Sequence, residues 1–170
     1  MSNPAPACAA AFPDCIETPC LRQLYLYWEA RRGNREFPAR RDLDPLDFRF
    51  ALGHIVLIDV LYTPLRFRFR VHGSELSLRA GYDMTGKMAE ELPDPKNRAR
   101  LIERCRGLVE RPRPLRVADQ WPLGKRLFSY EAVWLPLGEA GRPVTMLMAG
   151  MVYRDGRTTG PQEWQPESAA

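Results

Sequence analysis

Two neighbouring stretches near the middle of the chain constrain its fold more than any other part of the sequence. Residues 65–72 alternate between apolar side chains and arginine or histidine, which places His72 on the same face as the three arginines. Because successive side chains of a strand point to opposite faces of a sheet, this pattern predicts a strand with one buried face. Residues 55–61 are apolar on both faces except at Asp59, and Pro64 favours a tight turn between the two stretches. Together they predict a hairpin whose first strand is buried on both sides.

The ends of the chain define where we expect the folded part to begin and stop. Residues 1–17 are rich in proline and alanine without a periodic apolar face, and residues 155–170 are mostly polar. Both stretches predict disordered tails around a folded unit at 18–154. The dipeptide Thr18-Pro19 is typical of a helix start. Apolar side chains then recur at the spacing of one helix face, at Leu21, Leu24, Tyr25 and Trp28.

This apolar helix face has two interpretations that the sequence leaves open. It covers the outer side of the sheet as part of the core, or it forms an interface with a second copy of the chain or with another protein. Leu26 and Tyr27 add apolar area on a second face of the helix, so one face suits the sheet and the other suits a partner. We expect a homodimer and assign the first face to the dimer or partner interface.

The remaining elements follow from capping residues and periodicity. We expect a short helix at 44–53, helical turns at 74–80 and 88–92, a long helix at 94–111, and strands at 115–121, 128–137 and 144–153. The last strand is apolar on both faces, like 55–61, so the two belong side by side in the middle of the sheet. This predicts an α+β fold with a five-stranded antiparallel sheet of order 2-1-5-4-3, helices on one face and an N-terminal helix.

Composition and charge are those of a globular protein without a membrane anchor. Apolar residues make up 45% of the chain and charged residues 27%. No apolar run approaches the roughly 20 residues of a membrane helix, and the first residues lack the features of a secretory signal. We therefore expect a cytoplasmic protein. The formal charge is +4 and the arginines are scattered, which favours solvated surfaces over nucleic-acid binding, a minor alternative.

The sequence offers little for catalysis or metal binding. His54 and His72 are the only histidines, and no phosphate-binding glycine motif with its following serine or threonine is present. No nucleophile with a base is apparent. The cysteines lack the spacing of metal ligands and are expected to be reduced thiols: Cys8, Cys15, Cys20 and Cys105. We therefore expect neither an enzyme nor a metal centre.

Several short runs spread over residues 19–154 together resemble one known protein family. They are Leu24–Trp28, Asp42–Asp47, Ile58–Val60, Arg66–Ser74, Gly81–Lys87, Tyr130-Glu131, Leu135–Leu137 and Met146–Tyr153. The chain resembles the stand-alone, single-domain PAS proteins that are common in alphaproteobacteria, with Ser74 where threonine is more usual. The resemblance implies the PAS fold and a cytoplasmic sensory or signalling module rather than a catalyst. Without an attached output domain, such a module is expected to act through a signalling protein or through its own assembly.

The resemblance also allows the known PAS cofactors to be compared with the sequence. Haem-binding relatives ligate iron with a histidine on the long helix, and residues 94–111 contain none. Light-sensing flavin relatives carry a reactive cysteine near the short helices, and residues 73–92 contain none. His-ligated haem and cysteinyl-flavin chemistry are therefore disfavoured, and the cofactor is left unassigned.

An apolar cavity between the sheet and the long helix remains as the candidate site. Its candidate ligand-binding residues are Phe67, Phe69, His72, Leu101, Cys105, Ser129, Tyr130, Trp134, Met146 and Met148. Core packing without a cavity is the competing interpretation, and the inward face of 128–137 is left open. A closed void of roughly 100 Å³ or more would favour a small-molecule sensor. Apolar side chains exposed on the outer sheet face would instead favour a ligand-free interaction or dimerisation adaptor.

Overall fold

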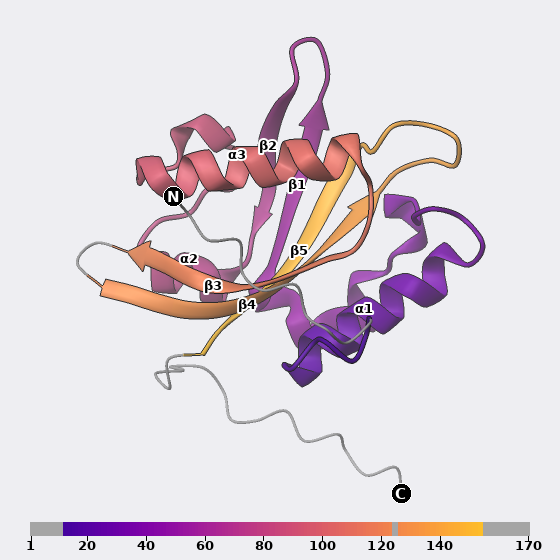
Figure 1. Ribbon diagram of the computed structural model, residues 1–170, viewed down its shortest axis with the longest axis horizontal. Coiled ribbons are helices and arrows are strands. Elements are labelled where there is room, and N and C mark those ends of the chain that lie inside the picture. Colours follow the sequence, from indigo (N-terminus) through magenta and orange to yellow (C-terminus); the bar gives the residue numbers. More distant parts are fainter. Residues whose placement is uncertain (1–11, 124–125, 155–170) are drawn as a thin grey trace, which may run out of the picture.

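The structure, a computed structural model, describes residues 12–123 and 126–154 of the chain. Five strands form one antiparallel sheet in the order β2-β1-β5-β4-β3 (Figure 1), which confirms the predicted fold class and strand order. The strands are β1 (Ile55–Leu61), β2 (Arg66–His72), β3 (Leu115–Leu123), β4 (Arg126–Leu137) and β5 (Met146–Tyr153). β3 and β4 extend two residues further into their hairpin than predicted, and β5 begins two residues later.

The two strands that are apolar on both faces, β1 and β5, lie side by side in the middle of the sheet. They pair antiparallel, from Ile55 opposite Gly150 to Asp59 opposite Met146. The first six residues of β1 and the first five of β5 are buried. Both faces of these strands are covered, which explains why their apolar runs are nearly continuous rather than alternating.

Helices cover both faces of this sheet. On one face, α3 (Pro95–Glu110) crosses the central strands (Figure 1), with the short helix η3 (Ala89–Glu91) beside it. The helix α2 (Ser74–Ala80) follows β2 directly. The other face is covered by α1 (Pro19–Arg32) and by the 3₁₀ segment η2 (Pro45–His54). None of the described helices is both long enough and apolar enough to cross a lipid bilayer.

The outer face of the sheet packs directly against α1. At Gly150 a Cβ atom would lie 2.7 Å from the side chain of Leu24 and 2.8 Å from that of Leu21, so the missing side chain lets the helix approach the strand closely. The indole N–H of Trp28 donates a 2.9 Å hydrogen bond to the carbonyl oxygen of Pro136. The apolar face of this helix is therefore part of the core.

Helix capping follows the sequence at two of the three predicted sites. The side chain of Asp94 accepts a 2.8 Å hydrogen bond from the backbone N–H of Asn97, and Asp44 accepts one of 2.9 Å from Leu46. The segment after Asp44 is a 3₁₀ helix interrupted at Phe48, whose backbone is not helical. Thr18 precedes α1 but does not cap it through its side chain. Its hydroxyl group binds elsewhere, in the cluster around Glu131 described below.

Residues 12–17, which the prediction placed in a disordered tail at 1–17, pack against the rest of the domain. Ile16 is fully buried and Cys15 nearly so. Phe12 packs against Tyr25 with 5.0 Å between ring centroids, and the guanidinium of Arg22 donates two hydrogen bonds to the carbonyl oxygen of Ile16. These apolar residues have no regular spacing, so periodicity could not reveal them. The predicted tail at 155–170 and residues 1–11 lie outside the described residues.

A β-bulge in β2 changes the facing that strict alternation predicts. Leu57 pairs with Val71, but the next residue, Ile58, pairs with Phe69, so Arg70 has no partner residue on β1. The extra residue shifts the alternation by one position. His72 therefore lies on the same side of the sheet as Phe69, and the prediction that it shares a face with the arginines is wrong.

Candidate functional site

A cavity of about 50 Å³ lies between the inner face of the sheet and α3. It is lined by Val56, Phe69, His72, Ala80, Tyr82, Leu92, Leu101, Arg104, Tyr130, Ala132, Trp134, Ala149, Met151 and Tyr153. Most of this lining is apolar or aromatic, and a few polar groups interrupt it. This composition is typical of small-molecule sites in proteins.

The inner faces of β4 and β5 create the space for this cavity. The register places Trp134 opposite Ala149 and Ala132 opposite Met151, so a large side chain faces a small one at each position. Alternation along each strand directs these residues to one side of the sheet. Gly150, the neighbour of Ala149, faces α1 on the other side. The two alanines leave room that a larger side chain would fill.

His72 contributes a polar group whose proton is located by its hydrogen bonds. Its Nδ1 accepts a 3.2 Å hydrogen bond from the backbone N–H of Met84 and lies 3.0 Å from the hydroxyl oxygen of Ser77. Burial lowers the pKa of His72 below 6.5, while the carboxylate of Asp83 acts in the opposite direction. The ring is therefore neutral near pH 7, and because Nδ1 accepts, Nε2 carries the hydrogen.

Trp134 and Arg104 form the second polar part of the lining. Trp134 is 5% exposed, and its indole N–H is buried without a hydrogen-bond partner among the described residues. The guanidinium carbon of Arg104 lies 5.6 Å from the centroid of the Trp134 ring, a cation–π contact. The guanidinium of Arg104, half-buried on α3, forms no hydrogen bond or ion pair with the described part of the chain.

The structure brings half of the predicted ligand-binding residues together. Those that line the cavity are Phe69, His72, Leu101, Tyr130 and Trp134. Those that do not are Phe67, Cys105, Ser129, Met146 and Met148. Phe67 and Cys105 are buried in the surrounding core. Ser129, Met146 and Met148 fall at strand positions that alternate with the cavity-lining ones, which places them on the outer side of the sheet.

Several lining residues were missed by the sequence reasoning. Ala132 lies between two predicted residues of the same strand face, Tyr130 and Trp134, so choosing that face would have identified it. Arg104 lies one helical turn after Leu101, but its charge excluded it from an apolar helix face. Small and charged residues that shape the cavity are therefore among those that a search for apolar periodicity omits.

The residues assigned to a partner interface lie inside the chain. Leu21, Leu24, Tyr25 and Trp28 are all buried between α1 and the rest of the molecule. They are therefore not available to a second subunit in this structure. The opposite side of the helix is accessible, since Leu26 is 49% exposed.

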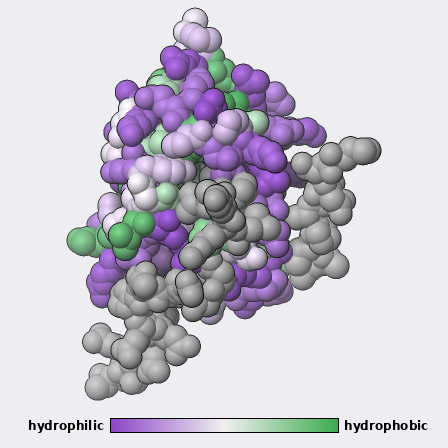
Figure 2. All heavy atoms as spheres, turned by 90° about the vertical axis from the view of Figure 1, so that its left-hand side faces the viewer, coloured by the Kyte–Doolittle hydropathy of each residue, from purple (hydrophilic) through white to green (hydrophobic). Residues whose placement is uncertain are grey.

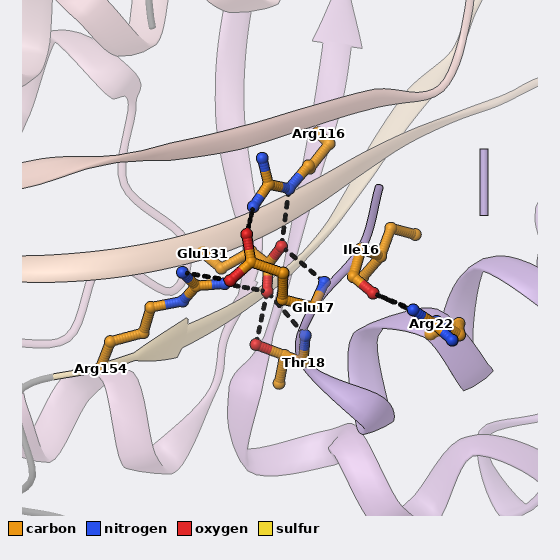
Figure 3. Close-up of polar contacts among 7 residues, drawn as sticks. All are labelled: Ile16, Glu17, Thr18, Arg22, Arg116, Glu131 and Arg154. Carbon is orange, nitrogen blue, oxygen red and sulfur yellow. Dashed lines mark hydrogen bonds and ion pairs between the residues drawn. The ribbon is translucent and has the colours of Figure 1, made fainter. Parts of the chain in front are cut away.

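The buried carboxylate of Glu131, on the outer face of the sheet, binds residues near both ends of the described chain (Figure 3). Glu131 of β4 accepts hydrogen bonds from the backbone N–H groups of Glu17 and Thr18. It also binds the guanidinium groups of Arg116 on β3 and Arg154 after β5, each at 2.7 Å. Burial alone would raise the pKa of Glu131, and these hydrogen bonds together lower it to about 2.

The cavity does not fit a haem or a flavin. An engineered cavity of about 150 Å³ accommodates benzene, so a void of about 50 Å³ is too small for the fused rings of either group. The long helix presents Leu101 and Arg104 to the cavity, and neither ligates iron. Within residues 12–123 and 126–154, no three His, Cys, Asp or Glu side chains are grouped as metal ligands would be.

Comparisons with known proteins match this architecture. The PAS domain of BvgS from Bordetella pertussis aligns with a TM-score of 0.51 at 15% sequence identity, over 79% of this chain and 88% of that chain. The LOV protein of Rhodobacter sphaeroides aligns with a TM-score of 0.46 at 15% identity, over 69% and 71%. No curated protein matches significantly. The family model described as PAS domain matches residues 16–150. Because this match covers most of the sequence, the chain belongs to the PAS domain family.

Proposed function

We propose that this PAS domain is a sensory module that binds a small apolar or amphipathic molecule in the cavity between the sheet and α3. The observation that carries the proposal is an apolar void whose lining includes an unpaired indole N–H and an unpaired guanidinium among the described residues. A buried polar group without a partner is unfavourable, so such groups commonly mark a place where another molecule binds.

The relay to a protein partner would pass through β4 and β5. Tyr130 and Trp134 face the cavity, while Glu131 between them faces the cluster on the other side of the same strand. A guest that shifts β4 would also shift the carboxylate that holds Thr18 before α1 and Arg154 after β5. Both ends of the folded unit would then respond to one occupied site, which is the requirement for coupling between sites.

A non-catalytic role agrees with the chemistry of the candidate nucleophiles and bases. Burial raises the pKa of the Cys105 thiol to about 12, so the reactive thiolate is scarce at neutral pH. The Nδ1 atom of His72 already accepts a backbone hydrogen bond. Neither group is placed to act as a nucleophile or base on a guest.

A ligand-free adaptor is the second candidate, and two observations favour it. The cavity holds about 50 Å³, half the volume that we set as favouring a sensor. Two leucines are 71% exposed, Leu46 on η2 and Leu78 on α2, and Leu26 adds apolar surface on α1. The face seen in Figure 2 is nevertheless mostly hydrophilic, with small separate apolar areas. The outer sheet face, which would have been the docking surface of an adaptor, is covered by α1.

Nucleic-acid binding has little support, because the arginines of β2 are already engaged in ion pairs. Arg68 and Arg70 both bind the carboxylate of Asp59, at 3.0 and 2.8 Å, and Arg66 binds Glu90 at 3.1 Å. A phosphate backbone would have to compete with these ion pairs.

The sensor and the adaptor are distinguished by filling the cavity. Ala132→Val adds two methyl groups inside it, and Ala99→Leu, on the exposed side of α3, is the control. We expect native mass spectrometry or thermal unfolding with small apolar compounds to show a guest on the wild type and on the control but not on Ala132→Val. Absence of any guest, with a dimer that Leu26→Glu dissociates in sedimentation, would support the adaptor instead.

A further inference from the structure

We infer that the guest of this cavity is a short-chain monocarboxylate, whose carboxylate is received by Arg104 and Trp134 and whose apolar chain lies against the small residues of β4 and β5. This inference rests on the proposed function, because it assumes that the cavity between the sheet and α3 is a binding site. It adds the chemical class of the guest and the residues that recognise it.

The charge of the lining is the first argument. Arg104 is the one permanently charged side chain among the lining residues, and the lining contains no aspartate or glutamate. One turn earlier on the same helix, Arg100 lies 3.7 Å from the carboxylate of Asp119 and donates to the carbonyl oxygen of Gln120. Arg104 has no such partner among the described residues. A half-buried guanidinium without a counter-ion favours an anionic guest.

The direction of the hydrogen bonds is the second argument. An arginine guanidinium and an indole N–H can only donate. The free nitrogen of His72, Nε2, is also a donor in the neutral ring, because Nδ1 is used as an acceptor. These three groups are all donors, so they favour a guest that accepts hydrogen bonds. The tyrosine hydroxyl groups of the lining can donate or accept, and the lining has no negative charge to bind a cation, so a carboxylate, with two acceptor oxygens and a negative charge, fits best.

The size of the cavity and its walls limit the rest of the guest. A volume of about 50 Å³ is a third of the roughly 150 Å³ that accommodates the six carbons of benzene, so it takes an alkyl chain of only about two or three carbons beyond a carboxylate that lies at the half-buried Arg104. The walls on β1, β4 and β5 include the apolar Val56, Ala132, Ala149 and Met151, and the lining holds no second permanent cation for a second carboxylate. A monocarboxylate therefore fits this lining better than a dicarboxylate.

The test compares charged and neutral guests of the same shape on the full chain. Butyrate and butyramide are titrated at constant ionic strength, with calorimetry for the Kd and thermal unfolding as a second readout. We expect butyrate to bind at least tenfold more tightly than butyramide. Octanoate, which is too long for the cavity, should bind more weakly than butyrate.

Substitutions of Arg104 and Trp134 test whether these two residues recognise the carboxylate of the guest. Arg104→Met should abolish the preference for butyrate while leaving butyramide binding in place, and Arg104→Lys should keep part of it. Trp134→Phe removes the indole N–H together with the five-membered ring that carries it, and should weaken both guests. Arg106→Met, on the exposed side of α3, is the matched control and should bind like the wild type. If Arg104→Met does not fold, Arg104→Gln gives the same comparison.

Two outcomes would overturn the inference, and they are distinguishable. Equal binding of butyrate and butyramide, or an unchanged preference in Arg104→Met, would refute the carboxylate while the cavity remains a binding site. Failure of every probe to bind, together with unchanged behaviour of Ala132→Val, would refute the proposed function and this inference with it.

Discussion

Glu131 shows how much of this fold depends on a single side chain. Its carboxylate is fully buried and accepts hydrogen bonds from two backbone N–H groups, one hydroxyl group and two guanidinium groups. A buried charge is tolerated only when it is paired and hydrogen-bonded, and this carboxylate meets both conditions. Its backbone donors, Glu17 and Thr18, lie more than a hundred positions before it in the sequence.

Replacing this carboxylate by an amide should therefore be costly. We expect Glu131→Gln to lower the free energy of unfolding by about 3 kcal/mol, because Arg116 and Arg154 lose the buried one of the two carboxylates that they share, and keep only the exposed Glu17. The measurement is urea unfolding at pH 7. The control is Glu139→Gln, which breaks the exposed ion pair with Arg41 and should change stability by less than about 1 kcal/mol. Similar losses in both variants would contradict the special role of Glu131.

His72 makes stability depend on pH in a defined direction. Its pKa is lower in the folded protein than its ordinary value of 6.5, so the unfolded chain binds the proton more readily. Stability should therefore fall as the pH drops below about 6.5, and level off once the folded protein is also protonated. Urea midpoints between pH 5 and 8 measure this effect. His72→Gln should flatten the curve in part, because His54, whose pKa is also lowered by burial, remains. An unchanged curve would mean that His72 is not the group responsible.

At the scale of elements, two glycines show opposite roles in packing. Gly150 on β5 leaves room for α1, where a Cβ atom would press on two buried leucines. Gly107 on α3 has nothing within 4 Å of the position of its missing Cβ. The same substitution at the two sites therefore separates tertiary packing from backbone preference.

Alanine should have effects of opposite sign at these positions. We expect Gly150→Ala to destabilise the protein by about 1–2 kcal/mol, because α1 must shift or its leucines must change rotamer. Gly107→Ala should stabilise it by about 0.5–1 kcal/mol, because alanine loses less backbone entropy in a helix than glycine. Denaturant unfolding of both variants gives the comparison. A stabilising effect of Gly150→Ala would show that α1 does not pack closely on β5.

At the scale of the whole molecule, the two sides of the sheet belong to one core. Buried residues of α1, of the sheet and of α3 form a single connected cluster. A change under α1 should therefore affect the side of the sheet that holds the cavity, as the proposed relay requires.

A substitution under α1 tests this cooperativity. We expect Trp28→Ala to lower the free energy of unfolding by about 3–5 kcal/mol, with a single transition seen alike by circular dichroism and fluorescence. Leu26→Ala, on the exposed side of the same helix, should change stability by less than about 0.5 kcal/mol. Two separate transitions in Trp28→Ala would show that α1 unfolds independently of the sheet.

Local sequence patterns determined the type and order of the elements. Apolar runs in 55–61 and 144–153 identified the central strands, and the order of the sheet followed from placing them side by side. Capping residues such as Asp94 located helix starts within a residue. These signals are local, because the spacing of apolar residues within an element shows whether one or both of its faces are buried.

Only the tertiary structure decided the site. The bulge that turns His72 toward the cavity depends on the register between two strands, and periodicity within one strand cannot show it. The burial of Ile16, the inward face of β4 and the meeting of Arg104 with Trp134 depend on residues far apart in the sequence. A cavity is the volume that packing leaves over, so its existence and size belong to the assembled core and not to any one segment.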